Sequence, residues 1–107
     1  MDKKTLLHDI RDAVATRKIR WSGHTLGRLL ERGISRTRVV GAIRHGEVIQ
    51  SYADDLPFPS VLIAHVDDDP VHVVVGYDEA NTEVHVITAY RPDLEHFEED
   101  YKTRRTT

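Results

Sequence analysis

The hydrophobic pattern of this chain changes its period once, near Gly46. Before that glycine, apolar residues recur every three or four positions, as they do on the buried side of an amphipathic helix. After it, short runs rich in valine and isoleucine are separated by turn residues, a pattern typical of strands. A chain of 107 residues is long enough for one hydrophobic core. We therefore expect a single α+β domain over residues 1–107, in which helices precede a sheet.

Three helices are expected in the first half of the chain. The first lies within residues 1–18, where apolar positions recur at helical spacing. The second begins after Ser22, whose hydroxyl can cap the first turn, and ends at Gly33, which suits a left-handed C-terminal position. Ser35 is placed to cap the third helix, and Gly46 to end it.

Strands are expected in the second half. β-Branched residues mark four of them, at residues 47–52, 61–66, 71–77 and 84–90. The short connections between the last three predict hairpins, so these strands form an antiparallel meander with residues 47–52 at one edge. The expected architecture is therefore N-terminal helices packed on a four-stranded, mainly antiparallel sheet.

Three smaller segments complete the expected fold. Residues 19–21 form a brief extended piece between the first two helices. Asp93 can cap a short acidic C-terminal helix that reaches Tyr101, and residues 102–107 form a loose tail.

Tight hairpin pairing predicts which side chains share each face of the sheet. The face beneath the helices should carry Leu62, Ala64, Val66, Val71, Val73, Val75, Val84, Val86, Thr88 and Tyr90. The opposite face should carry Val61, Ile63, His65, His72, Val74, His85, Ile87 and Ala89. A slip of one residue in either hairpin would exchange the two sets.

The second helix has a polar side with an unusual composition. At about 100° per residue, His24, Arg28 and Arg32 lie within roughly 80° of arc. The opposite side carries Leu26, Leu29 and Leu30. Arginine grips phosphate oxygens through its planar fork, and histidine exchanges protons near neutral pH, so this side suits a phosphate. The alternative is an ordinary solvated helix face.

Charge is divided unevenly along the chain. Residues 1–50 hold 11 Lys and Arg against 5 Asp and Glu, a net of +6, whereas residues 51–107 hold 4 against 13, a net of −9. The formal net charge of −3 therefore conceals a basic half that can meet phosphates and an acidic half that can meet something else.

Three chemical interpretations fit these residues. The first is a metal-independent ribonuclease, which needs a base, an acid and cations for the charge on the phosphate. His24 or His72 would exchange protons, Arg28 and Arg32 would hold the phosphate, and Tyr90 would stack on a base or donate its phenolic proton. Further RNA contacts are expected from Arg20, Arg36, Arg38, Arg44 and Tyr52. No cofactor is expected.

The other two interpretations involve no such chemistry. In one, His65 and His72 face each other across a hairpin near Asp67 to Asp69 and hold a metal ion, although a third sure ligand is missing. In the other, the basic helical face binds RNA or an acidic protein without catalysis. His24→Ala would then cost a binder little, whereas an enzyme would lose turnover.

The sequence does not suggest export or membrane insertion. The first residues are charged, unlike a secretory signal, and no run approaches the roughly 20 apolar residues of a membrane span. The chain has no cysteine, which excludes disulfides. We expect a cytoplasmic protein without membrane partners.

The basic helix also carries a family resemblance. The segment Trp21-Ser22-Gly23-His24-(x3)-Arg28-(x2)-Glu31-Arg32-Gly33-Ile34-Ser35 resembles a bacterial family catalogued as a domain of unknown function. The resemblance extends to His85-Val86-Ile87-Thr88-Ala89-Tyr90-(x)-Pro92-Asp93, so the signature region covers residues 21–93. Thr25 and Gly27 depart from the family pattern, the first where alanine is usual.

Such domains look like RelE-type toxins of bacterial toxin–antitoxin pairs, which share the barnase/RelE-like fold and cut RNA without a metal ion. The resemblance implies an endoribonuclease toxin acting on RNA, either free or ribosome-bound. It also implies a cognate antitoxin of the zinc-ribbon or helix-turn-helix type.

Overall fold

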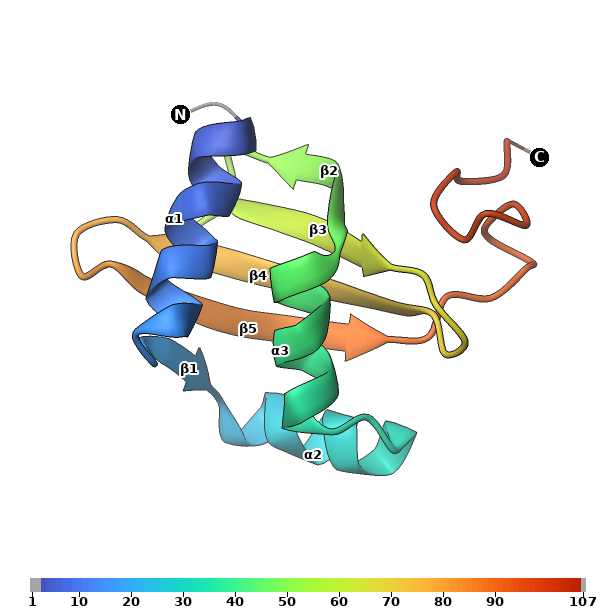
Figure 1. Cartoon of the computed structure of the whole chain (residues 1–107), viewed down its shortest axis with the longest axis horizontal. Helices are drawn as coiled ribbons and strands as arrows, with labels where there is room; N and C mark the ends of the chain where they lie inside the picture. Colours follow the sequence, from blue (N-terminus) through green and yellow to red (C-terminus); the bar gives the residue numbers. More distant parts are fainter. Residues whose placement is uncertain (1–2, 107) are drawn as a thin grey trace.

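The structure is a computed structural model that describes residues 3–106. It contains three helices and five strands in one α+β arrangement (Figure 1). The helices are α1 (Lys3–Ala15), α2 (Gly23–Arg32) and α3 (Arg36–His45). The strands are β1 (Ile19–Trp21), β2 (Glu47–Tyr52), β3 (Ser60–His65), β4 (Val71–Asp78) and β5 (Glu83–Tyr90).

The five strands form one mixed sheet in the order β1-β5-β4-β3-β2. Strands β2 to β5 pair antiparallel, as expected, with β2 at one edge. The prediction of only four strands is wrong, because residues 19–21 pair parallel with Val84 to Val86 as the other edge strand. An isolated extended tripeptide gives no local sign of a partner more than 60 residues away.

Local capping defines α2 and α3 as the sequence predicts. The Ser22 hydroxyl accepts a bond from the Thr25 amide at 3.0 Å, and Ser35 caps Arg38 in the same way at 3.0 Å. Gly33 adopts the left-handed conformation, with φ of 65°, that ends α2. These caps fix the short link between the two helices.

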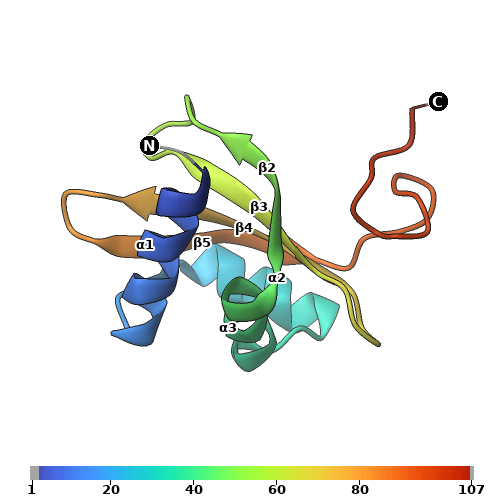
Figure 2. The same ribbon diagram turned by 45° about the horizontal axis from the view of Figure 1, so that its top comes forward.

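Helices α1 and α3 cover one face of the sheet, and no helix of residues 3–106 lies on the opposite face (Figures 1 and 2). We call that opposite face the helix-free face. The buried core on the helix-covered side includes Ile10, Val39 and Ile43 from the helices. The sheet contributes Val61, Ile63, Val71, Val73, Val75, Tyr77, Val84, Val86 and Ala89.

The predicted face assignment is correct for most of β4 and wrong for β3. Val61 pairs with Val75 and Ile63 with Val73, so these odd-numbered residues of β3 lie beneath the helices in place of Leu62 and Ala64. His65 changes face with them. Val66, predicted to be buried, is 38% exposed beyond the strand. The observed β3–β4 register differs by one residue from the predicted register. Such a difference moves every side chain of a strand to the opposite face of the sheet.

The predicted face assignment is also wrong for the last residues of β5, because of a β-bulge. The β4–β5 register shifts between Val74 and Val75, so Val86 lies beneath the helices but Thr88 does not. Ala89 takes the core position, and Thr88 and Tyr90 lie on the helix-free face opposite Val74 and His72.

The predicted acidic helix after Asp93 is absent. Asp93 does cap one turn, because its carboxylate accepts the His96 amide at 2.9 Å, but the chain then folds back on itself. Phe97 pairs with Arg104 across an isolated bridge, and its side chain is buried. A helix would bring acidic residues together one turn apart, whereas the folded-back segment buries an aromatic ring.

No helix within residues 3–106 has the length and apolar character needed to cross a membrane.

Candidate functional site

Helix α2 lies along the part of β5 that β1 does not cover. Thr25 is 3% exposed, and its hydroxyl lies 3.2 Å from the carbonyl oxygen of Val86 and 3.1 Å from that of Ile87. An unpaired strand edge would leave these carbonyls open to another chain. The helix therefore protects the edge and fixes its own position beside the sheet.

Arg32 reaches around this edge to the helix-free face. Its guanidinium donates to the carbonyl oxygen of Ala89 at 2.7 Å and to the hydroxyl of Thr88 at 3.2 Å. Thr88 and Tyr90 share that face two positions apart along β5. The helix thus holds a permanent positive charge at the rim of the face that carries Tyr90.

His24 and Arg28 continue this basic flank along α2. Both residues precede Arg32 in the helix, and helical geometry places them on the side of α2 away from the buried Leu29. Both are exposed, and Arg28 pairs with Glu31 at 3.3 Å. We call His24, Arg28 and Arg32 the basic flank of α2.

The apolar side of α2 is narrower than the sequence predicts. Leu29 is buried and Leu26 half-buried, but Leu30 is 84% exposed. Because α2 rests on a sheet edge rather than across a sheet face, only a thin stripe of the helix is covered.

His72 and Tyr90 form a pair on the helix-free face. They occupy opposite positions in β4 and β5, and Nδ1 of His72 lies 3.3 Å from the hydroxyl of Tyr90. Nε2 of His72 lies 2.6 Å from the carbonyl oxygen of Tyr101, which can only accept a hydrogen bond. In its neutral form His72 therefore carries its proton on Nε2 and accepts the Tyr90 proton at Nδ1.

The segment after Asp93 covers this pair. Phe97 packs edge-on against the His72 ring with centroids 4.6 Å apart, and Lys102 reaches Glu47 of β2 at 3.1 Å. The segment therefore crosses one end of the sheet from β5 to β2. His72 is 0% exposed beneath it.

Burial changes the proton affinities of both groups. Desolvation lowers the pKa of His72 below 6.5, the bond to the Tyr101 carbonyl opposes this effect, and the charge of Arg104 adds to it. Desolvation also raises the pKa of Tyr90 above its usual value. At neutral pH the pair is an uncharged imidazole beside an uncharged phenol.

The lowered pKa of His72 predicts a pH-dependent stability. As pH falls below about 6.5, the unfolded chain takes up this proton before the folded one, so unfolding becomes easier. The loss levels off below the pKa of His72 in the folded protein. Urea titrations between pH 7.5 and 5 should show this slope in the wild type and in His24→Gln, an exposed control. The slope should flatten in His72→Gln, and an unchanged slope there would contradict the explanation.

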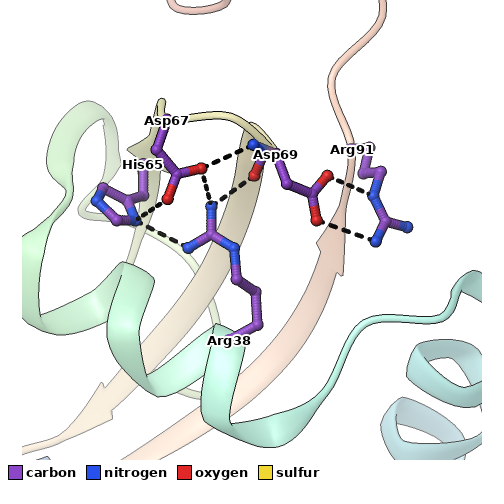
Figure 3. Close-up of polar contacts among 5 residues, drawn as sticks. All are labelled: Arg38, His65, Asp67, Asp69 and Arg91. Carbon is purple, nitrogen blue, oxygen red and sulfur yellow. Dashed lines mark hydrogen bonds and ion pairs between the residues drawn. The ribbon is translucent and has the colours of Figure 1, made fainter.

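A cluster of charged residues joins the helices to the β3–β4 hairpin (Figure 3). Arg38, at the start of α3, donates to Nδ1 of His65 at 2.8 Å and pairs with Asp67 at 3.0 Å. It also donates to the carbonyl oxygen of Asp69. Arg38 was predicted to contact RNA, and in the structure its guanidinium is bound to the β3–β4 hairpin.

Arg91 completes this cluster on the other side of the hairpin. It forms a two-bond ion pair with Asp69, at 2.8 and 3.2 Å, and donates to the carbonyl oxygens of Arg32 and Gly33. The bonds from Arg91 hold the pKa of the Asp69 carboxyl below its usual range. Arg91 thus caps the C-terminus of α2 and ties the backbone of Arg32 to the hairpin.

The remaining predicted RNA contacts are dispersed. Arg20 pairs with Glu83 at the β1–β5 edge. Arg36 and Arg44 are exposed on α3, and Tyr52 is half-buried at the end of β2. The structure places Arg32 on the face of β5 that carries Tyr90, which lies beside His72, whereas Arg28 and His24 lie one and two helical turns farther along α2.

Sequence reasoning missed the Arg91–Asp69 ion pair and the bond of Thr25 to the β5 edge. Arg91 and Asp69 are 22 residues apart, and no spacing rule pairs them. Thr25 offered a signal, because a hydroxyl stands where the family pattern usually has alanine. The hydroxyl of Thr25 bonds to the β5 edge only because α2 packs beside that strand, and the sequence does not reveal this packing.

The proposed metal ligands do not share a site. His65 pairs with Val71 and faces the helices, whereas His72 pairs with Ala64 and faces the other way. Within residues 3–106, groups that could approach one metal ion are His8 with Asp9 and Asp12, and Asp93 with Glu95 and His96. Both groups lie at the surface, where clustered acidic residues are ordinary.

A comparison with known protein families matches residues 21–91 to the "Domain of unknown function (DUF4258)". The match covers more than half of the chain. The chain belongs to the DUF4258 family. The DUF4258 region contains α2, the strands that carry His72 and Tyr90, and Arg91. Helix α1 and the segment covering His72 lie outside it. No curated protein and no solved structure shows a significant match to the chain.

Proposed function

We propose that this DUF4258 protein binds RNA along the basic flank of α2 and the neighbouring helix-free face, and that it cleaves the RNA without a metal ion. The finer form of the proposal is a RelE-like endoribonuclease toxin, acting on free or ribosome-bound RNA. Its support is one observation: Arg32 is anchored at the β5 edge on the face that carries the Tyr90–His72 pair.

The chemistry requires two proton transfers at one phosphate. The 2′-oxygen forms a bond to phosphorus, and the bond from phosphorus to the 5′-oxygen breaks. We assign the first transfer to Tyr90, which accepts the 2′-hydroxyl proton as it passes its own to Nδ1 of His72. His24 gives a proton to the leaving 5′-oxygen, and Arg28 and Arg32 stabilise the charge on the phosphate.

The covering segment limits this reaction. His72 is fully buried under Phe97 and the Tyr101 carbonyl, so the relay must run through the partly exposed Tyr90. A substrate phosphate would approach from the β5 edge, past Arg32. Direct contact between the substrate and His72 would require the segment after Asp93 to move away.

Expression in a bacterial host tests the proposal. The wild type should arrest growth, and the double variant His24→Ala/Arg28→Ala should not, because it removes the proton donor and one phosphate cation. With purified protein, RNA cleavage should fall by about 10²-fold or more. Lys4→Ala removes an exposed positive charge from α1 and should behave as the wild type. If the wild type and the double variant are equally toxic or equally harmless, the assignment is wrong.

The complete burial of His72 favours a second candidate, an RNA-binding domain without catalysis. Such a binder would yield no cleavage products at any pH. Loss of one phosphate contact in Arg28→Ala would still flatten the dependence of log affinity on log salt by about 0.7 for single-stranded RNA.

A toxin also needs an antitoxin, which we propose to be of the zinc-ribbon or helix-turn-helix type. A small open reading frame of either type beside the gene would support the toxin. Co-expression of its product with this chain should then restore growth.

A further inference from the structure

Tyr77 forms the wall between two cavities at the β4–β5 hairpin end of the molecule. A cavity of about 370 Å³ lies on one side, lined by Asp9, Asp12 and Thr16 of α1 and by Thr82 of the hairpin. A cavity of about 360 Å³ lies on the other, where Glu79 borders apolar side chains that include Leu6, Pro57 and Phe58. We call this double hollow the Tyr77 groove.

The Tyr77 side chain has an unused hydrogen-bonding group. The residue is 5% exposed, and its backbone amide donates to the carbonyl oxygen of Pro59 at 3.0 Å. Its hydroxyl has no hydrogen-bond partner among residues 3–106. The hydroxyl oxygen is not among the buried unpaired atoms of the described residues, so it reaches solvent in the groove and can bond to a ligand there.

The charges around the groove are mostly negative. Burial raises the pKa of Tyr77, and the carboxylates of Asp9, Glu79, Asp12 and Asp78 raise it further. Asp78 is occupied by Asn81, and Asp12 lies 3.3 Å from the imidazole of His8.

Two carboxylates at the groove lack an ion pair within the described part of the chain, and one cation touches the rim. Asp9 and Glu79 have no ion pair among the described residues. Lys18 reaches the rim, where its ammonium donates to the Thr82 hydroxyl at 2.8 Å.

We propose that the Tyr77 groove binds an arginine-bearing segment of a partner protein. The guanidinium would enter the acidic cavity, and a neighbouring apolar side chain would enter the other. This surface lies at the end of β4 opposite His72, so the inference does not rest on the proposed RNA chemistry.

The chemistry of the groove favours a guanidinium over other cations. Asp9, Asp12 and the Tyr77 hydroxyl offer acceptors on one wall, and a guanidinium presents five donors in a fixed plane. An ammonium is more strongly hydrated and has fewer donors, and a nucleic acid would be repelled by the carboxylates. The apolar second cavity suits a peptide better than a free amine.

Titration of the isotopically labelled full chain with a short peptide tests this surface. The probe is acetyl-Ala-Arg-Leu-Arg-Ala-amide, compared with its lysine counterpart and with spermidine. The arginine peptide should shift the amide signals of Thr16, Tyr77 and Thr82 and should bind more tightly than either comparison. Its affinity should fall about tenfold in Asp12→Asn, because a charge-assisted bond is lost.

Two further variants separate a specific site from general attraction. Tyr77→Phe removes only the hydroxyl and should weaken the peptide by several-fold, about the effect of one hydrogen bond. Asp68→Asn removes an equal charge from the exposed β3–β4 hairpin and should leave the affinity unchanged. Equal losses in Asp68→Asn and Asp12→Asn, equally tight binding of spermidine, or no shift at Tyr77 would each overturn the proposal.

Discussion

Gly46→Ala should destabilise the protein by about 3 kcal/mol or more. A Cβ at this position would lie 2.5 Å from the carbonyl oxygen of Ala42, 2.8 Å from that of Ala64 and 2.6 Å from a methyl carbon of Ile63. Two of these atoms belong to the backbones of α3 and β3, which cannot turn aside. The added methyl group would therefore push the end of α3 away from the sheet.

A second glycine in α3 provides the control. Gly41 lies in the helix interior, and a Cβ there would meet no atom of another element within 4 Å, so Gly41→Ala should stabilise the protein by about 0.5–1 kcal/mol. Urea unfolding of the two variants should thus shift in opposite directions from the wild type. A small loss in Gly46→Ala would mean that α3 and β3 are less closely packed than the structure indicates.

Tyr90→Phe should reduce RNA cleavage by about 10²-fold or more while leaving the fold intact. The substitution keeps the ring beside His72 and removes the hydroxyl that lies 3.3 Å from Nδ1 of that imidazole. Without the hydroxyl, the proposed proton path from the ribose to His72 is broken. The stability cost should be about 1 kcal/mol, the usual net worth of one hydrogen bond.

Tyr77→Phe is the matched control for this prediction. Tyr77 is buried at the end of β4 opposite His72, so its hydroxyl lies away from the proposed reaction. Cleavage should therefore change little in this variant, as measured by initial rates on one RNA substrate at several pH values. Unimpaired cleavage in Tyr90→Phe would exclude Tyr90 from the reaction. Only a lack of cleavage by the wild type would leave the binding function as the better interpretation.

The caps and element boundaries could be predicted because they depend on neighbours in sequence. Ser22, Gly33 and Ser35 act on amides and carbonyls within one turn of themselves. The position of a capping serine is therefore enough to predict where α2 and α3 begin. The hairpins were predictable for the same reason, because short polar connections leave their strands few other partners.

The candidate site was only partly predictable. Arg32, His72 and Tyr90 were singled out by their residue types, but the predicted convergence of all five residues depended on sheet faces that one bulge reverses. The bulge between Val74 and Val75 places Tyr90 beside His72 instead of beneath the helices. No local pattern in either strand marks that shift.

The sequence by itself determined helices α1 to α3, strands β2 to β5 and the basic character of α2, because these follow from contacts between residues a few positions apart. The tertiary structure alone decided that α2 closes the β5 edge, that Arg32 reaches Thr88, and that the segment after Asp93 buries His72. Each of these contacts joins residues 29 or more positions apart. Such contacts form only when the whole core packs, so pairing register and burial, rather than local propensity, select them.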